Sequence, residues 1–183
     1  KSFFLFVGGL YRRKNLKNLV KAFELYKRET DSDKKLVVVG KKLKEGKAVL
    51  EMIEQSDYRK DIILTGRIDD DGEVKKIMAS AYALTYVSIL EGFGLPMVEA
   101  MKSGVPVIAS NVTSMPEIGG DAALYVDPQN PADIAKKMKI LSEDTEFRKE
   151  LIHQALIQSQ QFDWDISAEM LWDTMERVVA FKS

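Results

Sequence analysis

The chain has 183 residues, of which 45% are hydrophobic and 30% are charged, and it has a net charge of −1 and no cysteine. This length and composition predict one ordinary soluble domain, too small for two full lobes, and they exclude a disulfide scaffold. No stretch approaches the roughly 20 apolar residues that a membrane span needs, and we see no signal peptide. We therefore expect a cytoplasmic location.

The charges are unevenly distributed along the chain. Basic residues outnumber acidic ones in the first fifty positions, and the remainder is acidic. This asymmetry favours an anionic ligand near the N-terminal third, although solvated helix faces account for most of these lysines. Nucleic acid is not expected, because the basic residues are not interleaved with aromatic ones and no nucleic-acid module signature is present.

Short apolar runs alternate with helical patterns in chain order. We expect strands at 3–7, 35–39, 61–65, 83–87, 106–110 and 122–126. We expect a first helix with a buried stripe of Leu16, Leu19, Val20 and Phe23, others near 45–57, 71–81 and 95–103, and three more from about Pro131. This order predicts an α/β fold over residues 1–183: a Rossmann-like, doubly wound, about six-stranded parallel sheet with helices on both faces and a C-terminal helical extension.

The unusual residues follow strands, where a doubly wound sheet binds its ligands. The turns after the first four strands contain Gly8-Gly9, Gly40, Gly66-Arg67 and the segment 88–94. Glycine there also has a purely structural interpretation, as a tight turn with positive φ. Arg12, Arg13 and Lys14 after the first strand could supply the charge-assisted donors that a diphosphate requires.

The fourth turn, EGFGLPMVE, places Glu91 and Glu99 around a Gly-x-Gly helix start. Pro96 suits the first helical position and Gly104 closes the helix. Free backbone N–H groups and the helix dipole at such a start attract phosphate or a polarised sugar oxygen, while a carboxylate accepts bonds from hydroxyls. The alternative is that both glutamates merely cap and solvate the helix.

Four segments together resemble one family: VGGLYRRKNLKNLVKAF, ILTGRIDD, SILEGFGLPMVEAMKSGVPVIASNVTSMPEIGGDAALYVDP and FDWDISAEMLW. They are similar to the C-terminal half of retaining, family-four glycosyltransferases of the GT-B fold, and the resemblance covers essentially the whole chain. In that family this half binds the nucleotide sugar, and an N-terminal domain, absent from this chain, supplies most of the acceptor site. We therefore expect one domain of a longer protein.

The resemblance implies a role for each matching residue. Glu99 would bind the ribose hydroxyls, Glu91 would approach the transferred hexose, and Arg13 and Lys14 would neutralise the diphosphate. The remaining donor-binding positions act through the backbone: Gly92, Phe93, Gly94 and Leu95 for sugar and phosphate oxygens, and Arg67 and Ile68 for the base edge. Gly9 also belongs to the donor site, but many members have arginine there, so the cationic role moves to Arg13 and Lys14.

The chemistry implied is transfer of a hexosyl group from UDP- or GDP-type sugar to a glycan or lipid-linked acceptor, in surface polysaccharide biosynthesis at the inner face of the membrane. We expect no cofactor and no metal, because fixed cations and helix N–H groups can stabilise the leaving phosphate.

Asp69, Asp70 and Asp71 are interpreted as a helix cap, and His153 as a helix residue. The paired glutamates also fit a glycosidase superficially. The alternatives are a stand-alone nucleotide-sugar module without turnover and an epimerase-like domain.

Overall fold

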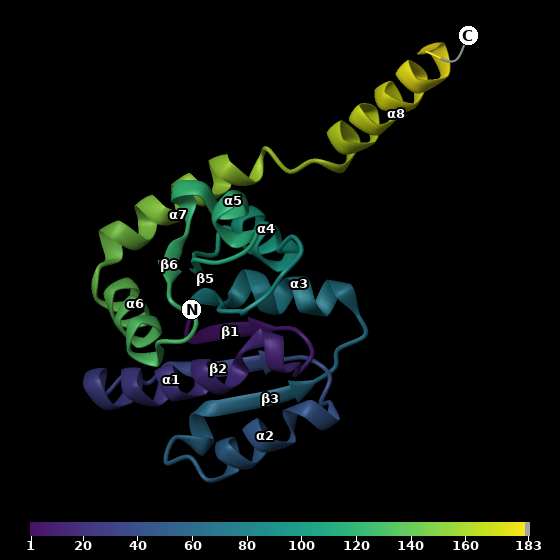
Figure 1. The fold of residues 1–183 in the computed structure, drawn as a ribbon. Coiled ribbons are helices and arrows are strands. Elements are labelled where there is room, and N and C mark those ends of the chain that lie inside the picture. Colours follow the sequence, from purple (N-terminus) through teal and green to yellow (C-terminus); the bar gives the residue numbers. More distant parts are fainter. Residues whose placement is uncertain (182–183) are drawn as a thin grey trace.

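The computed structural model describes residues 1–181 and contains a six-stranded, fully parallel sheet between two layers of helices (Figure 1). The strands are β1 (Phe3–Val7), β2 (Lys35–Val39), β3 (Ile62–Gly66), β4 (Ala83–Tyr86), β5 (Val107–Ser110) and β6 (Leu124–Val126). Their order is β3-β2-β1-β4-β5-β6. The chain therefore adds β2 and β3 on one side of β1, and then β4, β5 and β6 on the other side. The expected doubly wound fold is confirmed, and its switch point lies between β1 and β4.

The helices divide between the two faces of the sheet. They are α1 (Leu16–Thr30), α2 (Lys47–Glu54), α3 (Asp71–Ser80), α4 (Leu95–Lys102), α5 (Met115–Gly119), α6 (Pro131–Glu143), α7 (Thr145–Ser159) and α8 (Trp164–Phe181), with short 3-10 helices η1 (Arg12–Lys14), η2 (Lys44–Gly46), η3 (Arg59–Asp61) and η4 (Gly120–Ala122). One apolar cluster joins β1 and β2 to α1, α2 and α6. A second cluster joins the other face to α3, α4 and α5, and α7 contributes Leu151 to the first and Ala155 to the second.

The core is formed by apolar side chains at the positions that the sequence predicts. Phe4, Leu5 and Phe6 of β1 are all at most 3% exposed, as expected for a strand covered on both faces. The expected stripe of α1 is also confirmed, since its four members are at most 3% exposed. Gly40, after β2, is required by close approach: a Cβ there would lie 1.9 Å from the carbonyl oxygen of Gly8.

The structure corrects several expected boundaries. The last strand begins at Leu124 and not at 122, because Gly120–Ala122 form η4. The second helix is shorter than 45–57, since it follows η2, where Gly46 packs so closely that a Cβ would lie 2.7 Å from that of Leu10. Pro96 occupies the second helical position of α4, after Leu95. Helix α5 was not expected from the sequence.

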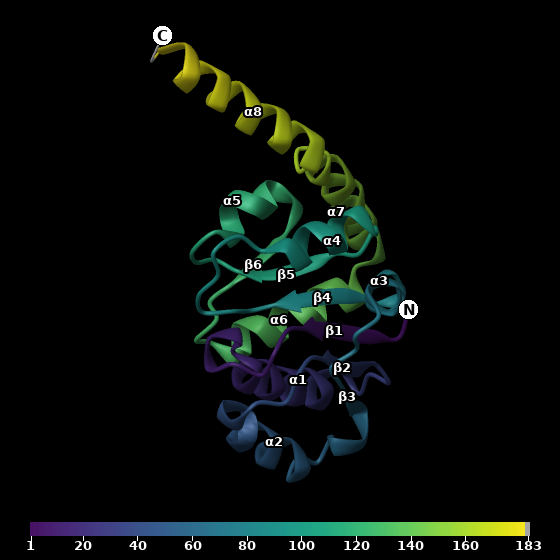
Figure 2. The ribbon, with the colours of Figure 1, turned by 90° about the vertical axis from the view of Figure 1, so that its right-hand side faces the viewer.

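Helix α8 extends away from the rest of the structure (Figures 1 and 2). None of its residues, 164–181, is buried. Its exposed large apolar side chains include Trp164, Met170, Leu171, Trp172 and Met175, each more than half exposed. Within residues 1–181, no helix combines the length and the apolar character required to cross a bilayer.

Candidate functional site

The candidate site lies at the carboxyl ends of β1 and β4, where two loops are joined by hydrogen bonds. The backbone N–H of Ile89 donates to the carbonyl of Arg13 at 2.7 Å. Asn15, buried and in the left-handed conformation with φ 59°, donates its side-chain amide to the carbonyls of Val87 at 2.9 Å and Pro128 at 2.7 Å. The loop that carries Arg13 and Lys14 is thereby held against the loop that leads to Glu91.

Arg13 and Lys14 both contact Glu91. Lys14 Nζ lies 2.6 Å from Oε1 of Glu91, and Arg13 Nη1 lies 3.1 Å from its Oε2. The Glu91 side chain is only 8% exposed, and that of Arg13 is 47% exposed. Burial raises the pKa of Glu91, but hydrogen bonds with Lys14 and Ser88 and the Lys14 charge outweigh it, so the net pKa lies below the ordinary value. Glu91 is therefore an ionised, buried carboxylate at neutral pH.

Tyr86, the last residue of β4, completes what we call the Glu91 cluster: Arg13, Lys14, Tyr86 and Glu91. Its hydroxyl accepts a hydrogen bond from Lys14 Nζ at 3.2 Å, and the same ammonium lies 5.0 Å from the centre of its ring. Tyr86 is 3% exposed. Burial raises its pKa, and the charges of Glu91 and Glu99 raise it further, so both glutamates act on one hydroxyl.

Sequence reasoning missed Tyr86, because it belongs to an apolar strand and was interpreted as core. The signal that could have identified it is its position. A tyrosine at the carboxyl end of a central parallel strand has its ring in the core and its hydroxyl near the edge of the sheet where ligands bind.

The start of α4 offers unpaired backbone donors. Gly94 has φ 122°, a conformation that favours glycine, and Ser114 Oγ donates to the Phe93 carbonyl at 2.6 Å to hold the turn. Within residues 1–181, the backbone N–H groups of Gly92, Phe93, Gly94 and Leu95 make no hydrogen bond. Four such groups at the positive end of a helix are a favourable site for anionic oxygens.

Glu99 lies one turn further along α4 and does not contact the Glu91 cluster. Partial burial of its carboxyl group raises its pKa, Lys75 of α3 opposes this, and Asp71 adds to it. Glu99 lines two hollows, of about 210 Å³ against α3 and about 330 Å³ against Phe93, Phe162 and Trp164. Glu91 and Glu99 thus have different neighbours: Glu91 pairs with Arg13 and Lys14 before α4, and Glu99 lies within α4 beside α3.

Three other residues expected to bind the donor, Arg67, Ile68 and Gly9, lie elsewhere along the carboxyl edge of the sheet. Arg67 and Ile68 follow β3, two strands beyond β1, and the exposed side chain of Arg67 pairs with Asp69 at 2.5 Å. Gly9 lies beside Tyr11: a Cβ there would lie 2.9 Å from Tyr11 Cε2. A larger residue at position 9 would therefore displace the Tyr11 ring.

Asp70 and His153 have structural positions, directly before α3 and within α7. Asp70 caps α3 as expected, because its side chain accepts bonds from the N–H groups of Gly72 at 2.7 Å and Glu73 at 3.3 Å. His153 is exposed on α7. In the described part of the chain, no three histidine or acidic side chains gather in a way that could hold a metal ion.

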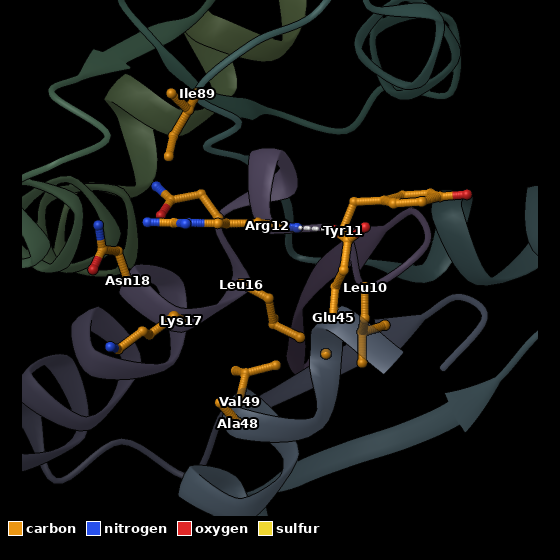
Figure 3. Close-up of a pocket in the computed structure, with 12 residues that line it drawn as sticks. Leu10, Tyr11, Arg12, Leu16, Lys17, Asn18, Glu45, Ala48, Val49 and Ile89 are labelled. Carbon is orange, nitrogen blue, oxygen red and sulfur yellow. Dashed lines mark hydrogen bonds between the residues drawn. The ribbon is translucent and has the colours of Figure 1, made fainter. Parts of the chain in front are cut away.

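A third hollow, of about 700 Å³, lies beside η1, and neither Glu91 nor Glu99 lines it (Figure 3). Figure 3 shows Arg12 stretched across it above Leu16, with Ile89 on one side and Ala48 and Val49 on the other. It borders the candidate site at Asn15 and at Ile89, the residue whose N–H bonds the Arg13 carbonyl.

Comparisons with known proteins agree with this fold. The family model described as "Glycosyl transferases group 1" matches residues 1–157. O-antigen chain mannosyltransferase B of Escherichia coli is 34% identical over 161 residues, which are 88% of this chain and 42% of that protein. The serotype-specific mannosyltransferase WbdA of Escherichia coli is 30% identical over 179 residues, 97% of this chain and 22% of that protein. The chain thus spans less than half the length of these relatives.

Solved structures share the fold. The C-terminal domain of LpcC, a glycosyl transferase group 1 family protein from Francisella tularensis, has a TM-score of 0.78 and 25% identity, over 88% of this chain and 85% of that one. Sucrose-phosphate synthase from Thermosynechococcus elongatus has a TM-score of 0.87 at 24% identity, over 98% of this chain and 46% of that one. The chain belongs to the group 1 glycosyltransferases and has the fold of the C-terminal domain of a GT-B enzyme.

Proposed function

We propose that this chain is the donor-binding domain of a retaining glycosyltransferase that moves a hexosyl group from a nucleoside-diphosphate sugar to a glycan or lipid-linked acceptor. The observation that carries the proposal is the convergence of Arg13 and Lys14 on Glu91, beside the unpaired N–H groups that begin α4. Two relatives are named as mannosyltransferases, one of them for the O-antigen chain, which supports a hexosyl donor and a role in surface polysaccharide synthesis.

The cluster suggests how the donor binds. A diphosphate competes with Glu91 for the two cations, since phosphate oxygens accept the same charge-assisted bonds. Glu91 then becomes available to accept hydrogen bonds from hexose hydroxyls. As the sugar departs, negative charge grows on the phosphate, and Arg13, Lys14 and the N–H groups of 92–95 stabilise it without requiring a metal or cofactor.

The order of residues along the edge of the sheet suggests the course of the nucleotide. The hexose lies near Glu91 and the diphosphate between η1 and α4. The ribose reaches Glu99, whose surroundings differ from those of Glu91. The base extends toward the backbone of Arg67 and Ile68 after β3, which β2 and β1 separate from β4.

We also propose that a second, N-terminal domain completes the acceptor side. The relatives are more than twice as long as the matched segment, and α8 presents an apolar face that the described residues do not cover. Packing of that face against another domain would remove it from water. This favours a two-domain enzyme over a stand-alone binding module.

The direct test is calorimetry of the chain with UDP, GDP and the corresponding nucleosides. We expect a nucleoside diphosphate to bind more tightly than its nucleoside. If no nucleoside diphosphate binds at millimolar concentration, the proposal fails. We expect little transfer by this domain alone, because the surface that orients the acceptor is not in it, and rapid turnover by it would contradict the two-domain proposal. The anomeric configuration of the product, read by NMR for the complete enzyme, tests retention.

A further inference from the structure

The Lys14 side chain is held on three sides. Its stem passes over Gly8, where φ is 148° and a Cβ would lie 3.3 Å from Lys14 Cε. Its ammonium lies against Glu91 and against both the hydroxyl and the ring face of Tyr86. Only 12% of this side chain is exposed. A lysine normally has a flexible stem with a hydrated charge, so this confinement fixes where the Lys14 charge lies.

Tyr86 and Glu91 share Lys14. The Tyr86 hydroxyl accepts a hydrogen bond from Lys14 Nζ at 3.2 Å, and the same ammonium lies 2.6 Å from Glu91 Oε1. The Lys14 charge helps to lower the pKa of Glu91, so a change in the position of this ammonium changes that pKa. A tyrosine hydroxyl is neutral at physiological pH, and burial raises the pKa of Tyr86 further, so this hydroxyl can accept and donate at once. Because an ammonium has three donors, Lys14 retains one for a ligand after bonding Tyr86 and Glu91.

We propose that Tyr86 is a positioning residue, which holds the Lys14 ammonium where it meets the diphosphate of the donor. This inference rests on the proposed function. Tyr86 itself touches neither sugar nor phosphate: it acts through Lys14, and it keeps the cation at the edge of the sheet when the diphosphate draws it away from Glu91. Arg13 is nearly half exposed, and its guanidinium bonds the Leu90 carbonyl at 3.2 Å and Glu91 at 3.1 Å.

The first test needs no nucleotide. In Tyr86→Phe the ring remains and the hydroxyl is lost, so the titration midpoint of Glu91, followed by carboxyl 13C NMR, should rise toward the ordinary value. Tyr125→Phe is the matched control, because that hydroxyl bonds the Gly120 carbonyl at 2.8 Å, away from the cluster. An unchanged Glu91 midpoint in Tyr86→Phe would overturn the proposal whether or not the chain binds a nucleotide.

The second test is a double-mutant cycle on nucleoside diphosphate affinity. Tyr86→Phe should weaken UDP or GDP about fivefold, as expected for one lost hydrogen bond, and leave the nucleoside unchanged. The effect should vanish in a Lys14→Met background, which keeps the stem without the charge. Equal weakening of nucleoside and diphosphate, or an effect that persists in Lys14→Met, would show a general structural role and refute positioning through Lys14. Failure of the unmodified chain to bind any diphosphate would refute the donor function instead, and the Glu91 titration would still decide the role of Tyr86.

Discussion

Lys14 Nζ and Glu91 Oε1 lie 2.6 Å apart, although the two residues belong to loops after different strands. The residue proposed to bind the leaving phosphate is thus paired with the residue proposed to meet the sugar. Each neutralises the other in a largely buried site, where an unpaired charge would be costly. A donor that brings both a diphosphate and hydroxyl groups can satisfy both partners at once.

The first prediction concerns the cations. Arg13→Ala combined with Lys14→Ala should weaken nucleoside diphosphate at least about tenfold, because a lost charge-assisted contact costs roughly 1.5 to 3 kcal/mol. The bare nucleoside should bind unchanged in calorimetry. Lys41→Ala with Lys42→Ala, two exposed loop lysines after β2, is the control and should alter neither ligand. Equal weakening of both ligands by the first pair would contradict a phosphate role.

The second prediction concerns Glu99. Glu99→Gln should weaken a ribonucleotide but have little effect on its 2′,3′-dideoxy analogue, because a carboxylate is a stronger acceptor than an amide only when hydroxyls are there to donate. Calorimetry with the paired ligands measures the difference. The ribose role is wrong if the substitution weakens both ligands to the same extent.

Glu91 should behave differently in the proposed two-domain enzyme. Glu91→Gln should lower kcat more than it weakens free nucleotide, because its expected partner is the hexose near the developing charge. Steady-state kinetics and nucleotide binding on the same preparation measure the two effects. Loss of nucleotide affinity with unchanged kcat would reverse the proposed division between Glu91 and Glu99. Thermal melting must accompany the variant, since Glu91 holds two cations.

Acid stability provides a fourth prediction. The folded-state pKa of Glu91 is lowered, so this group contributes stability above the unfolded pKa of about 4.5, and that contribution is lost as pH falls through the lower folded value. Asp61, paired with Lys27 and Lys35, behaves in the same way. Glu91→Gln should therefore reduce, without abolishing, the fall in unfolding free energy between about pH 5 and 3. Urea unfolding at each pH is the measurement, and an identical pH dependence of the variant would contradict the ion pair.

A fifth prediction concerns α8. Removal of residues 164–183 should leave the melting temperature of the remainder nearly unchanged, because no residue of 164–181 is buried. Leu151→Ala in α7 provides the contrast, since Leu151 is 3% exposed and such a truncation typically costs about 2 to 5 kcal/mol. A large loss of stability on removing 164–183 would mean that α8 packs on this domain and is not free to meet another.

Much of the fold follows from local pattern. Continuous apolar runs identify the strands because parallel strands are buried on both faces, and glycines after them identify the edge where ligands bind. The helix start at Gly94 and the cap at Asp70 follow from backbone chemistry near in sequence. Helix α5 was missed because five residues are too few for a helical period to be recognised.

The candidate site was harder to predict, because its contacts join distant segments. The motifs identify Arg13, Lys14 and Glu91 as individual candidates, but only the tertiary structure pairs them. Tyr86 and Asn15 were missed for the same reason: a buried tyrosine resembles core, and an asparagine before a helix resembles a cap. Asn15 in fact makes no capping bond and directs its amide to two other loops.

The amide of Asn15 has a mechanical consequence. Its two hydrogens bond carbonyls that follow β4 and β6, while its own backbone follows β1. A displacement of any one of these three loops would break a buried hydrogen bond, at a cost of about 1 to 3 kcal/mol. The loops are therefore coupled as one rigid platform. In the two-domain enzyme proposed above, these three loops would therefore move together when the domains close over a donor.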